Sequence, residues 1–442
     1  MNAKPKFGVA LYADGTPFCR EGNVACEFRG EPFAFSSVSD LPAQTVWVTN
    51  ATLNDLIEAG LHKNPKLAHD GYFRTRLAQV AQELGLSQMS MDSQASFLAE
   101  LLGGCIEMAR LQMGLTQYPS AGLTQAVGQL YGCNEPPARS AMAQLAEQAC
   151  QRYTACERSR RYENPDVFSF WKPRQQWADM LINEPLPSAG PMRALPAHAL
   201  PSMGQDTNEL VEWALAEKIP LFAKIKILGL EPTVGQLMNY GAGANDVVNR
   251  AGSGEYIAKN LREWCALPEL EALAQVGDIQ VQQVVVADGW RSSGLKLEQG
   301  RLASVSYGYG LLAENLWVGL TRKPSQYGNV SRSISTAWLQ AIDRMQCLKM
   351  AERLTNLGME VANYGNGRIT VACPQSVRAL IPQVALEEGL LYPASLPDLK
   401  LYTPNQQNPT HVMQHLISSR DYGRMVSVDQ ALLKQMVAAS AA

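Results

Sequence analysis

Residues 338–374 show the most regular hydrophobic pattern of the chain. A helix from 338 to Gly358 is predicted by apolar residues at roughly helical spacing, namely Leu339, Ile342, Met345, Leu348 and Met350. Two short apolar runs follow, Met359–Ala362 and Ile369–Cys373, with Gly-Asn-Gly between them at 365–367. This arrangement predicts a β-hairpin. Its tip carries no acidic residue.

The N-terminal part of the chain predicts a small α/β domain at residues 1–70. Strands are expected at 6–12, 24–35 and 45–48, and a helix at 50–60 with Asn50 or Thr52 as its cap. Residues 71–155 are helical in pattern, which predicts a thumb-like or linking segment with helices at 78–84, 96–113 and 138–155.

The remaining pattern alternates between helices and strands. Proline-rich residues 184–206 predict a linker. Beyond it we expect helices at 207–229, 233–240 and 254–264, a strand at 279–287, and a hairpin at 295–307 that turns at 299–300. The segment 401–442 is expected to be a helical tail. The fold class predicted for the whole chain is therefore α+β.

Composition narrows the class of protein. With 46% hydrophobic and 18% charged residues the 442-residue chain is globular, and it has neither an apolar run of membrane-spanning length nor a secretory leader, so we expect a cytoplasmic protein. Nine cysteines without a CxxC pair indicate reduced thiols rather than a metal site, and no cofactor is expected. A net charge of -3 means that nucleic-acid binding would need local basic patches.

One such patch lies at residues 152–174, where Arg160, Arg161, Lys172 and Arg174 alternate with aromatic residues. Basic groups neutralise phosphates and flat rings stack on bases, so the segment fits a single strand or a primer end. It fits equally well a solvated helix end that leads into a buried aromatic strand.

Taken in order, several motifs resemble the polymerase half of family-A DNA polymerases of the phage type, over about residues 155–380. Residues 167–174, Val-Phe-Ser-Phe-Trp-Lys-Pro-Arg, resemble the family's D-[FY]-S-x-[IL]-E-x-R strand, with Val167 for the acid and Lys172 for the glutamate. The family's finger helix ends in Tyr-Gly, and this chain has a similar motif at Tyr240 and Gly241, with Gly243 beyond it.

Two further motifs complete the resemblance. Gln340 and Arg344 are similar to the family's Q-A-x-A-R helix. The family's hairpin motif begins V-H-D-E, and here residues 365–368, Gly-Asn-Gly-Arg, replace its His, Asp and Glu together. Upstream, Asn50–Asp55 is similar to a segment of the proofreading exonuclease domain, although the DxE of that domain is missing.

The resemblance implies a polymerase-like palm with helical fingers at residues 156–400. In such a palm two carboxylates hold two metal ions, and the resemblance places those ligands at Val167 and Gly367, which we expect to lie side by side. Asp166 directly precedes Val167, and because side chains alternate along a strand, its carboxylate would point to the opposite face of the sheet. Both ligands would then be lost, which implies a degenerate, non-catalytic polymerase.

The expected function is an accessory subunit in the DNA replication of a phage or mobile element, binding primer-template or single-stranded DNA, an active polymerase or another replication protein. The basic residues expected to contact nucleic acid are Arg160, Arg161, Lys172, Arg174, Arg322, Lys323, Arg332, Arg344 and Arg368. Two alternatives stay open. One is an active nucleotidyltransferase with Mg²⁺ that uses Asp166, Asp179 or Asp343, and the other is a structural protein with no nucleic-acid role.

Overall fold

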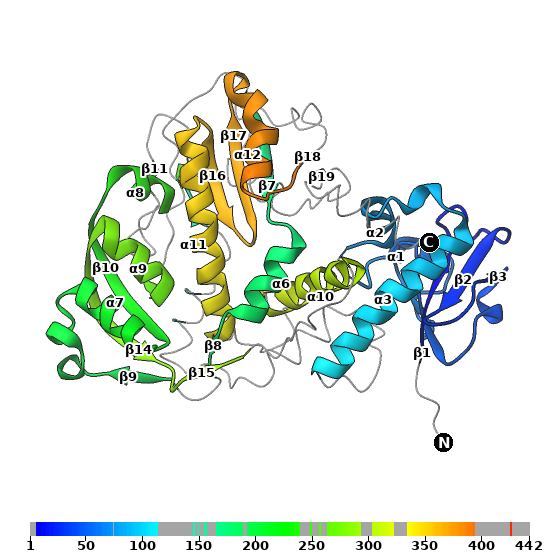
Figure 1. Ribbon diagram of the computed structural model, residues 1–442, viewed down its shortest axis with the longest axis horizontal. Helices are drawn as coiled ribbons and strands as arrows, with labels where there is room; N and C mark the ends of the chain where they lie inside the picture. Colours follow the sequence, from blue (N-terminus) through cyan, green and yellow to red (C-terminus); the bar gives the residue numbers. More distant parts are fainter. Residues whose placement is uncertain are drawn as a thin grey trace.

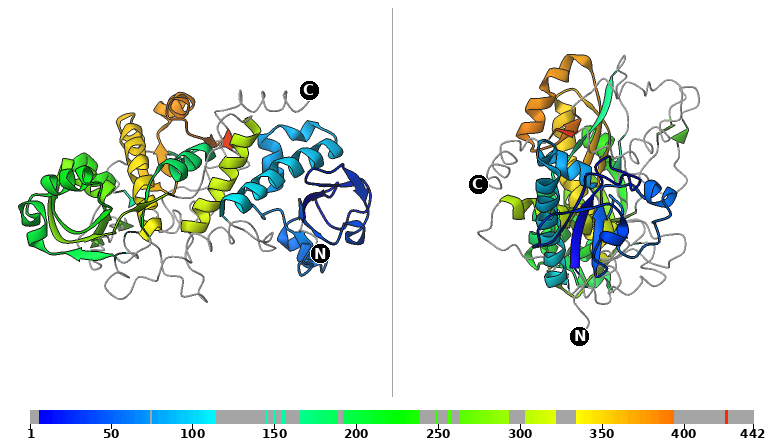
Figure 2. Two further views of the ribbon diagram at one scale, coloured as in Figure 1. Left: turned by 60° about the horizontal axis from the view of Figure 1, so that its bottom comes forward. Right: turned by 90° about the vertical axis from the view of Figure 1, so that its right-hand side faces the viewer.

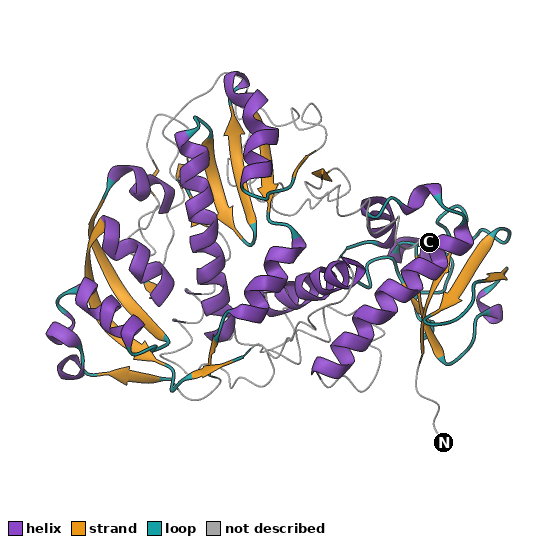
Figure 3. Cartoon of the chain, viewed as in Figure 1, coloured by secondary structure: helices purple, strands orange, loops and turns teal. Residues whose placement is uncertain are grey.

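The computed structural model describes residues 6–73, 75–113, 145, 149, 154–156, 165–188, 192–238, 248–249, 256–257, 263–292, 303–321, 334–393 and 425–426. These residues build an α+β fold of helices and separate sheets, as the sequence predicts (Figure 3). The N-terminal domain lies at one end of the long axis, and the sheet with helices α7 and α9 lies at the other (Figures 1 and 2). None of the described helices has the length and apolar character needed to cross a membrane.

The N-terminal domain is a five-stranded sheet in the order β3-β2-β1-β4-β5. Its strands are β1 (Lys6–Leu11), β2 (Asn23–Glu27), β3 (Phe33–Phe35), β4 (Thr45–Thr49) and β5 (Leu67–Ala68). Its helices are η1 (Val38–Asp40), α1 (Leu53–Glu58), α2 (Leu77–Glu83), η2 (Leu86–Gln88) and α3 (Met91–Met113). Thr52 caps α1 in a capping box with Asp55, and α3 packs on β1 and β2. The strands and helices predicted between residues 6 and 113 are thus confirmed.

The middle of the molecule is a four-stranded antiparallel sheet, which we call the central sheet. Its strands in spatial order are β6 (Thr154–Ala155), β16 (Glu360–Gly365), β17 (Arg368–Cys373) and β7 (Asp166–Trp171). Helix α11 (Ile334–Asn356) packs along β16 and β17, so the predicted helix and hairpin are confirmed. Every residue of β7, β16 and β17 is buried.

A second sheet, in the order β13-β10-β14-β9, packs against two helices (Figure 1). Its strands are β9 (Arg193–Leu195), β10 (Leu221–Leu230), β13 (Trp264–Ala266) and β14 (Gly277–Val286). The helices are α7 (Thr207–Ala216) and α9 (Leu267–Val276), with α8 (Pro232–Met238) after β10. The predicted helix 207–229 is wrong beyond Ala216, because Lys and Ile alternate from 224 to 227 in a strand pattern.

The structure corrects several other predictions. The linker 184–206 holds short elements, namely β8 (Leu186–Pro187), β9, η3 (Ala197–Ala199) and η4 (Pro201–Gly204). The described part of 254–264 is extended, in β12 (Tyr256–Ile257) and at Trp264, rather than helical; β12 pairs with β11 (Val248–Asn249). The predicted hairpin 295–307 is wrong from residue 303, where α10 (Ala303–Thr321) begins. Thr154–Ala155 and Met425–Val426 (β19) are strands within predicted helices.

Helices α6 (Arg174–Asn183), α10 and α3 join the central sheet to the N-terminal domain (Figure 1). The Thr75 hydroxyl donates to the Glu314 carboxylate at 2.9 Å, and the Tyr307 hydroxyl donates to Glu83 at 2.5 Å. Because these bonds link α10 to the N-terminal domain, the two parts share one interface. The remaining described elements are β15 (Trp290–Arg291), η5 (Gln375–Leu380), α12 (Ile381–Glu387) and β18 (Tyr392–Pro393).

Candidate functional site

The turn between β16 and β17 marks one end of the central sheet, which we call the hairpin end. Asn366 and Gly367 both adopt positive φ angles, 53° and 66°. The Lys172 backbone N–H donates to the Gly367 carbonyl at 2.8 Å. The C-terminal end of β7 therefore lies against the turn.

The strand register corrects the expected positions of the lost ligands. Val167 pairs with Ala372, whereas Trp171 pairs with Arg368 beside the turn. Ala372 is five positions along the chain from Gly367, which corresponds to about 16 Å of extended strand. The prediction that Val167 and Gly367 lie side by side is wrong, because β7 runs antiparallel to β17 and brings its last residue to the hairpin end.

One face of the sheet at the hairpin end carries a cation and an indole. The Arg368 guanidinium lies 5.3 Å from the centroid of the Trp171 ring, and residues paired across two strands share a face. Next along the strands, the Ser169 and Thr370 hydroxyls are hydrogen-bonded at 2.9 Å. Arg368 is completely buried, which argues against the predicted contact with nucleic acid.

Beside the turn lies a buried ion pair. Lys172 Nζ is 3.0 Å from Asp343 Oδ1, both side chains are 1% exposed, and Nζ also donates to Gln346 Oε1 at 2.5 Å. The Asp343 carboxylate accepts the Gly367 backbone N–H at 3.0 and 3.1 Å. Burial alone would lower the pKa of Lys172, but the charge of Asp343, the influence of Cys347 and the hydrogen bond to Asp343 together raise that pKa. We expected Lys172 to contact nucleic acid, but its ammonium group pairs with Asp343 inside the fold, which argues against that role.

Two tryptophans fill the space around the turn. Trp177 of α6 and Trp317 of α10 have ring centroids 4.5 Å apart. The Trp317 indole N–H donates to Asn366 Oδ1 at 2.8 Å. A Cβ atom added at Gly367 would lie 2.1 Å from Trp177 Cζ2. Side chains from helices α6, α10 and α11 thus pack around the hairpin turn.

Replacing Gly367 with alanine should destabilise the chain by about 3 kcal/mol, from overpacking against Trp177 and from the left-handed backbone. Gly60→Ala is the matched control, because Gly60 has a similar φ of +70° but open space around it. Urea unfolding of both variants measures the difference. Equal losses in the two variants would show that Trp177 does not constrain this position.

The other side of α11 holds a second buried ion pair. The Arg344 guanidinium donates to both Glu269 carboxylate oxygens, at 2.9 and 2.8 Å, and both side chains are 0% exposed. It also donates to the Ala149 carbonyl at 3.2 Å. This pair links α11 to α9, which argues against the predicted contact of Arg344 with nucleic acid. Gln340, from the same motif, is buried as well.

The remaining predicted site residues lie outside the described residues or have no described side chain. Arg174 begins α6, and its side chain is not among those described. The others lie outside the described residues: Arg160, Arg161, Arg322, Lys323, Arg332, Tyr240, Gly241 and Gly243. Their roles stay predictions.

The acids considered for an active site do not come together. Asp166 lies opposite Cys373, with Arg378 Nη1 3.3 Å from its carboxylate, whereas Asp343 lies at the hairpin end. Six residues of β17 separate these places, about 20 Å. Asp179 is exposed on α6. Throughout the described ranges, no group of three or more His, Cys, Asp or Glu side chains could hold a metal ion.

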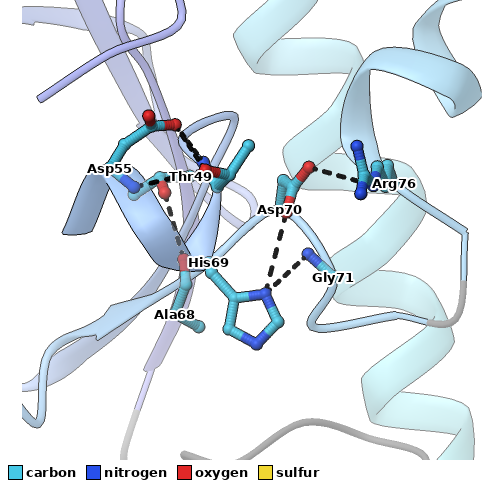
Figure 4. Close-up of polar contacts among 8 residues, drawn as sticks. Thr49, Asp55, Ala68, His69, Asp70, Gly71 and Arg76 are labelled. Carbon is cyan, nitrogen blue, oxygen red and sulfur yellow. Dashed lines mark hydrogen bonds and ion pairs between the residues drawn. The ribbon is translucent and has the colours of Figure 1, made fainter. Parts of the chain in front are cut away.

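Polar residues also gather where β4 and β5 end in the N-terminal domain (Figure 4). The Asp70 carboxylate lies 3.7 Å from His69 Nδ1 and 3.5 Å from Arg76 Nε. Asp55 caps α1, and the Asn50 amide group bonds to the backbone N–H and carbonyl of Tyr12, at 2.8 Å each. In this structure the segment that resembles an exonuclease domain therefore uses its polar side chains to hold loops and a helix end.

The sequence did not predict that Lys172, Asp343, Trp177 and Trp317 form one cluster. One local signal existed: Asp343 stands on the apolar stripe of α11, between Ile342 and Met345 on the sequence. A carboxylate on such a stripe needs a buried partner. Nothing local identified Lys172 as that partner.

Comparison with known proteins shows similarity to solved structures only. No protein-family model and no curated protein matches the chain. Phi29 DNA polymerase complexed with primer-template DNA and incoming nucleotides is similar over 86% of this chain and 82% of that chain, with a TM-score of 0.40 and 9% identity. The post-translocation binary complex of Phi29 DNA polymerase with primer-template DNA is similar over 85% of this chain and 82% of that chain, with a TM-score of 0.42 and 10% identity. At TM-scores below 0.5 this likeness carries no argument about the chain, and membership of family A stays a prediction.

Proposed function

We propose that the chain is a non-catalytic protein with a polymerase-like scaffold, which works by binding DNA or a replication protein as an accessory subunit in phage or mobile-element replication. The observation that supports the non-catalytic role is the set of side chains packed at the hairpin end. A lysine-aspartate pair and packed indoles stand where metal-dependent chemistry would need free carboxylates.

Two-metal phosphoryl transfer needs carboxylates that hold ions about 3.5–4 Å apart. The hairpin end has one acid, Asp343, whose carboxylate is already neutralised by Lys172. Arg368 adds a second fixed positive charge on the neighbouring strand. These charges repel a divalent cation, so the residues present do not fit Mg²⁺.

The alternative of an active nucleotidyltransferase would need Asp166 and Asp343 to share a pair of Mg²⁺ ions. Their places at opposite ends of the central sheet argue against it. The alternative of a structural or interaction protein is supported by the burial of Lys172, Arg344 and Arg368, because buried side chains cannot contact DNA. DNA binding therefore depends on the other predicted basic residues, which are Arg160, Arg161, Arg174, Arg322, Lys323 and Arg332.

One set of assays tests the proposal. With Mg²⁺ or Mn²⁺ the chain should extend no labelled primer, yet it should bind primer-template or single-stranded DNA with an affinity that falls as salt rises. Replacing Arg322 and Lys323 with glutamate should weaken binding about tenfold and flatten the salt dependence. The control, Lys63→Glu with Lys349→Glu, changes net charge equally at two exposed lysines.

Two results would overturn parts of the proposal. Primer extension that disappears in Asp166→Ala or Asp343→Ala would make the chain an enzyme. No binding of either DNA at low salt would remove the nucleic-acid role and leave a protein partner as the only ligand class of the proposal.

A further inference from the structure

The Lys172 ammonium group is enclosed on three sides. Its Nζ lies 3.0 Å from Asp343 Oδ1, 2.5 Å from Gln346 Oε1 and 5.7 Å from the centroid of the Trp177 ring. An ammonium group has three N–H donors and no acceptor. Two oxygens and an aromatic face are the groups that recognise alkylammonium ions in proteins.

Two of the enclosing groups, Asp343 and Trp177, also contact residues other than Lys172. Asp343 and Gln346 are three residues apart on α11 and so lie on one face of that helix. The Asp343 carboxylate is fixed by the Gly367 N–H, and Trp177 stacks against Trp317. The arrangement is therefore built by helices α6, α10 and α11 and by the hairpin turn, with Lys172 reaching in from the end of β7.

We propose that Asp343, Gln346 and Trp177 form an alkylammonium-binding cage, that the Lys172 side chain is its built-in ligand, and that the cage accepts a small primary alkylammonium ion when this side chain is shortened. A divalent metal is the poorer ligand. Mg²⁺ and Ca²⁺ take six or more oxygens, whereas the cage offers one carboxylate and one amide oxygen beside an indole.

The cage has a consequence for how the hairpin end is assembled. A buried carboxylate needs a positive partner, and a side chain of the same chain supplies it. The hairpin end can then fold without any bound ion. This inference goes beyond the proposed function and does not depend on DNA binding.

The test uses the full chain with Lys172→Ala, which removes the atoms that n-propylammonium would replace. The variant should unfold about 5 °C below wild type, and millimolar n-propylammonium should restore at least half of this loss. Wild type and Lys349→Ala, which alters an exposed lysine of α11, should show no such gain. Neither n-propanol nor sodium chloride at equal ionic strength should act.

Further outcomes decide against the cage. Equal rescue by n-propanol would show a simple cavity, and larger rescue by Mg²⁺ or Mn²⁺ would show a metal site. Rescue should also vanish in Lys172→Ala with Asp343→Asn, and its persistence would exclude Asp343 as the binding group. If Lys172→Ala does not fold by itself, the yield of refolded protein with and without n-propylammonium is measured instead of the melting temperature. A yield that the amine leaves unchanged would overturn the proposal. No DNA is present, so failure of the amine rescue leaves the DNA-binding part of the proposed function untouched.

Discussion

Replacing Arg344 with methionine is expected to lower the free energy of unfolding by about 3–5 kcal/mol. The substitution leaves the Glu269 carboxylate, which is 0% exposed, without the guanidinium that donates to both of its oxygens. A buried charge that loses its partner costs far more than an exposed one, because water cannot replace the lost interaction.

Arg353 provides the matched control on the same helix. Its side chain is 48% exposed and pairs with Glu387 and Glu388, so Arg353→Met should cost less than about 1 kcal/mol. Replacing Arg344 with methionine and Glu269 with leucine together should recover most of the loss, since an apolar pair replaces both charges. Urea unfolding measures all three variants. Similar losses in Arg344→Met and Arg353→Met would contradict the structural role of the buried pair.

Lys172→Met is expected to cost about 3–5 kcal/mol at neutral pH, because it leaves the Asp343 carboxylate buried without its ammonium partner. The raised pKa of Lys172 fixes the pH dependence. A lysine with a raised folded pKa contributes its full stability below the unfolded value of about 10.4 and loses it as pH rises through the folded pKa. The difference between wild type and variant should therefore shrink at strongly alkaline pH.

Other groups titrate in the same range, so the comparison must be made against the variant. Burial raises the pKa of Tyr12 and of Cys347, which faces Lys172, to about 12 each. Their effects are present in wild type and in Lys172→Met alike, apart from the small influence of Lys172 on Cys347. Lys349→Met serves as the exposed control. A constant difference between wild type and Lys172→Met from pH 7 to pH 12 would show that the ion pair does not stabilise the fold.

Local pattern was enough to predict the elements whose period is unambiguous. The helix ending near Gly358 and the hairpin after it agree with the structure because apolar spacing and turn residues indicate the same elements. β10 was predicted as helix because an apolar and lysine-rich run fits both periods when its partner strand is unknown. The start of α10 was missed because the alternating residues 295–307 were predicted as a hairpin turning at 299–300.

The candidate site was harder to predict than the fold. The register of β7 on β17 is set by residues about 200 positions apart in the sequence. The motif comparison therefore placed Val167 beside the hairpin turn, whereas it lies at the other end of the central sheet. Lys172, Arg344 and Arg368 were taken for surface residues because of their type. Their burial depends on partners such as Glu269 and Asp343, which only the fold brings near them.

The order of the strands in the central sheet also bears on how the protein is made. β7 leaves the ribosome before the hairpin strands that will cover it, and about 190 residues of chain lie between Trp171 and Glu360. At 5–20 residues per second this delay lasts about 10–40 s. Throughout it the aromatic strand, with Phe168, Phe170 and Trp171, lacks the hairpin strand that pairs with it in the folded chain.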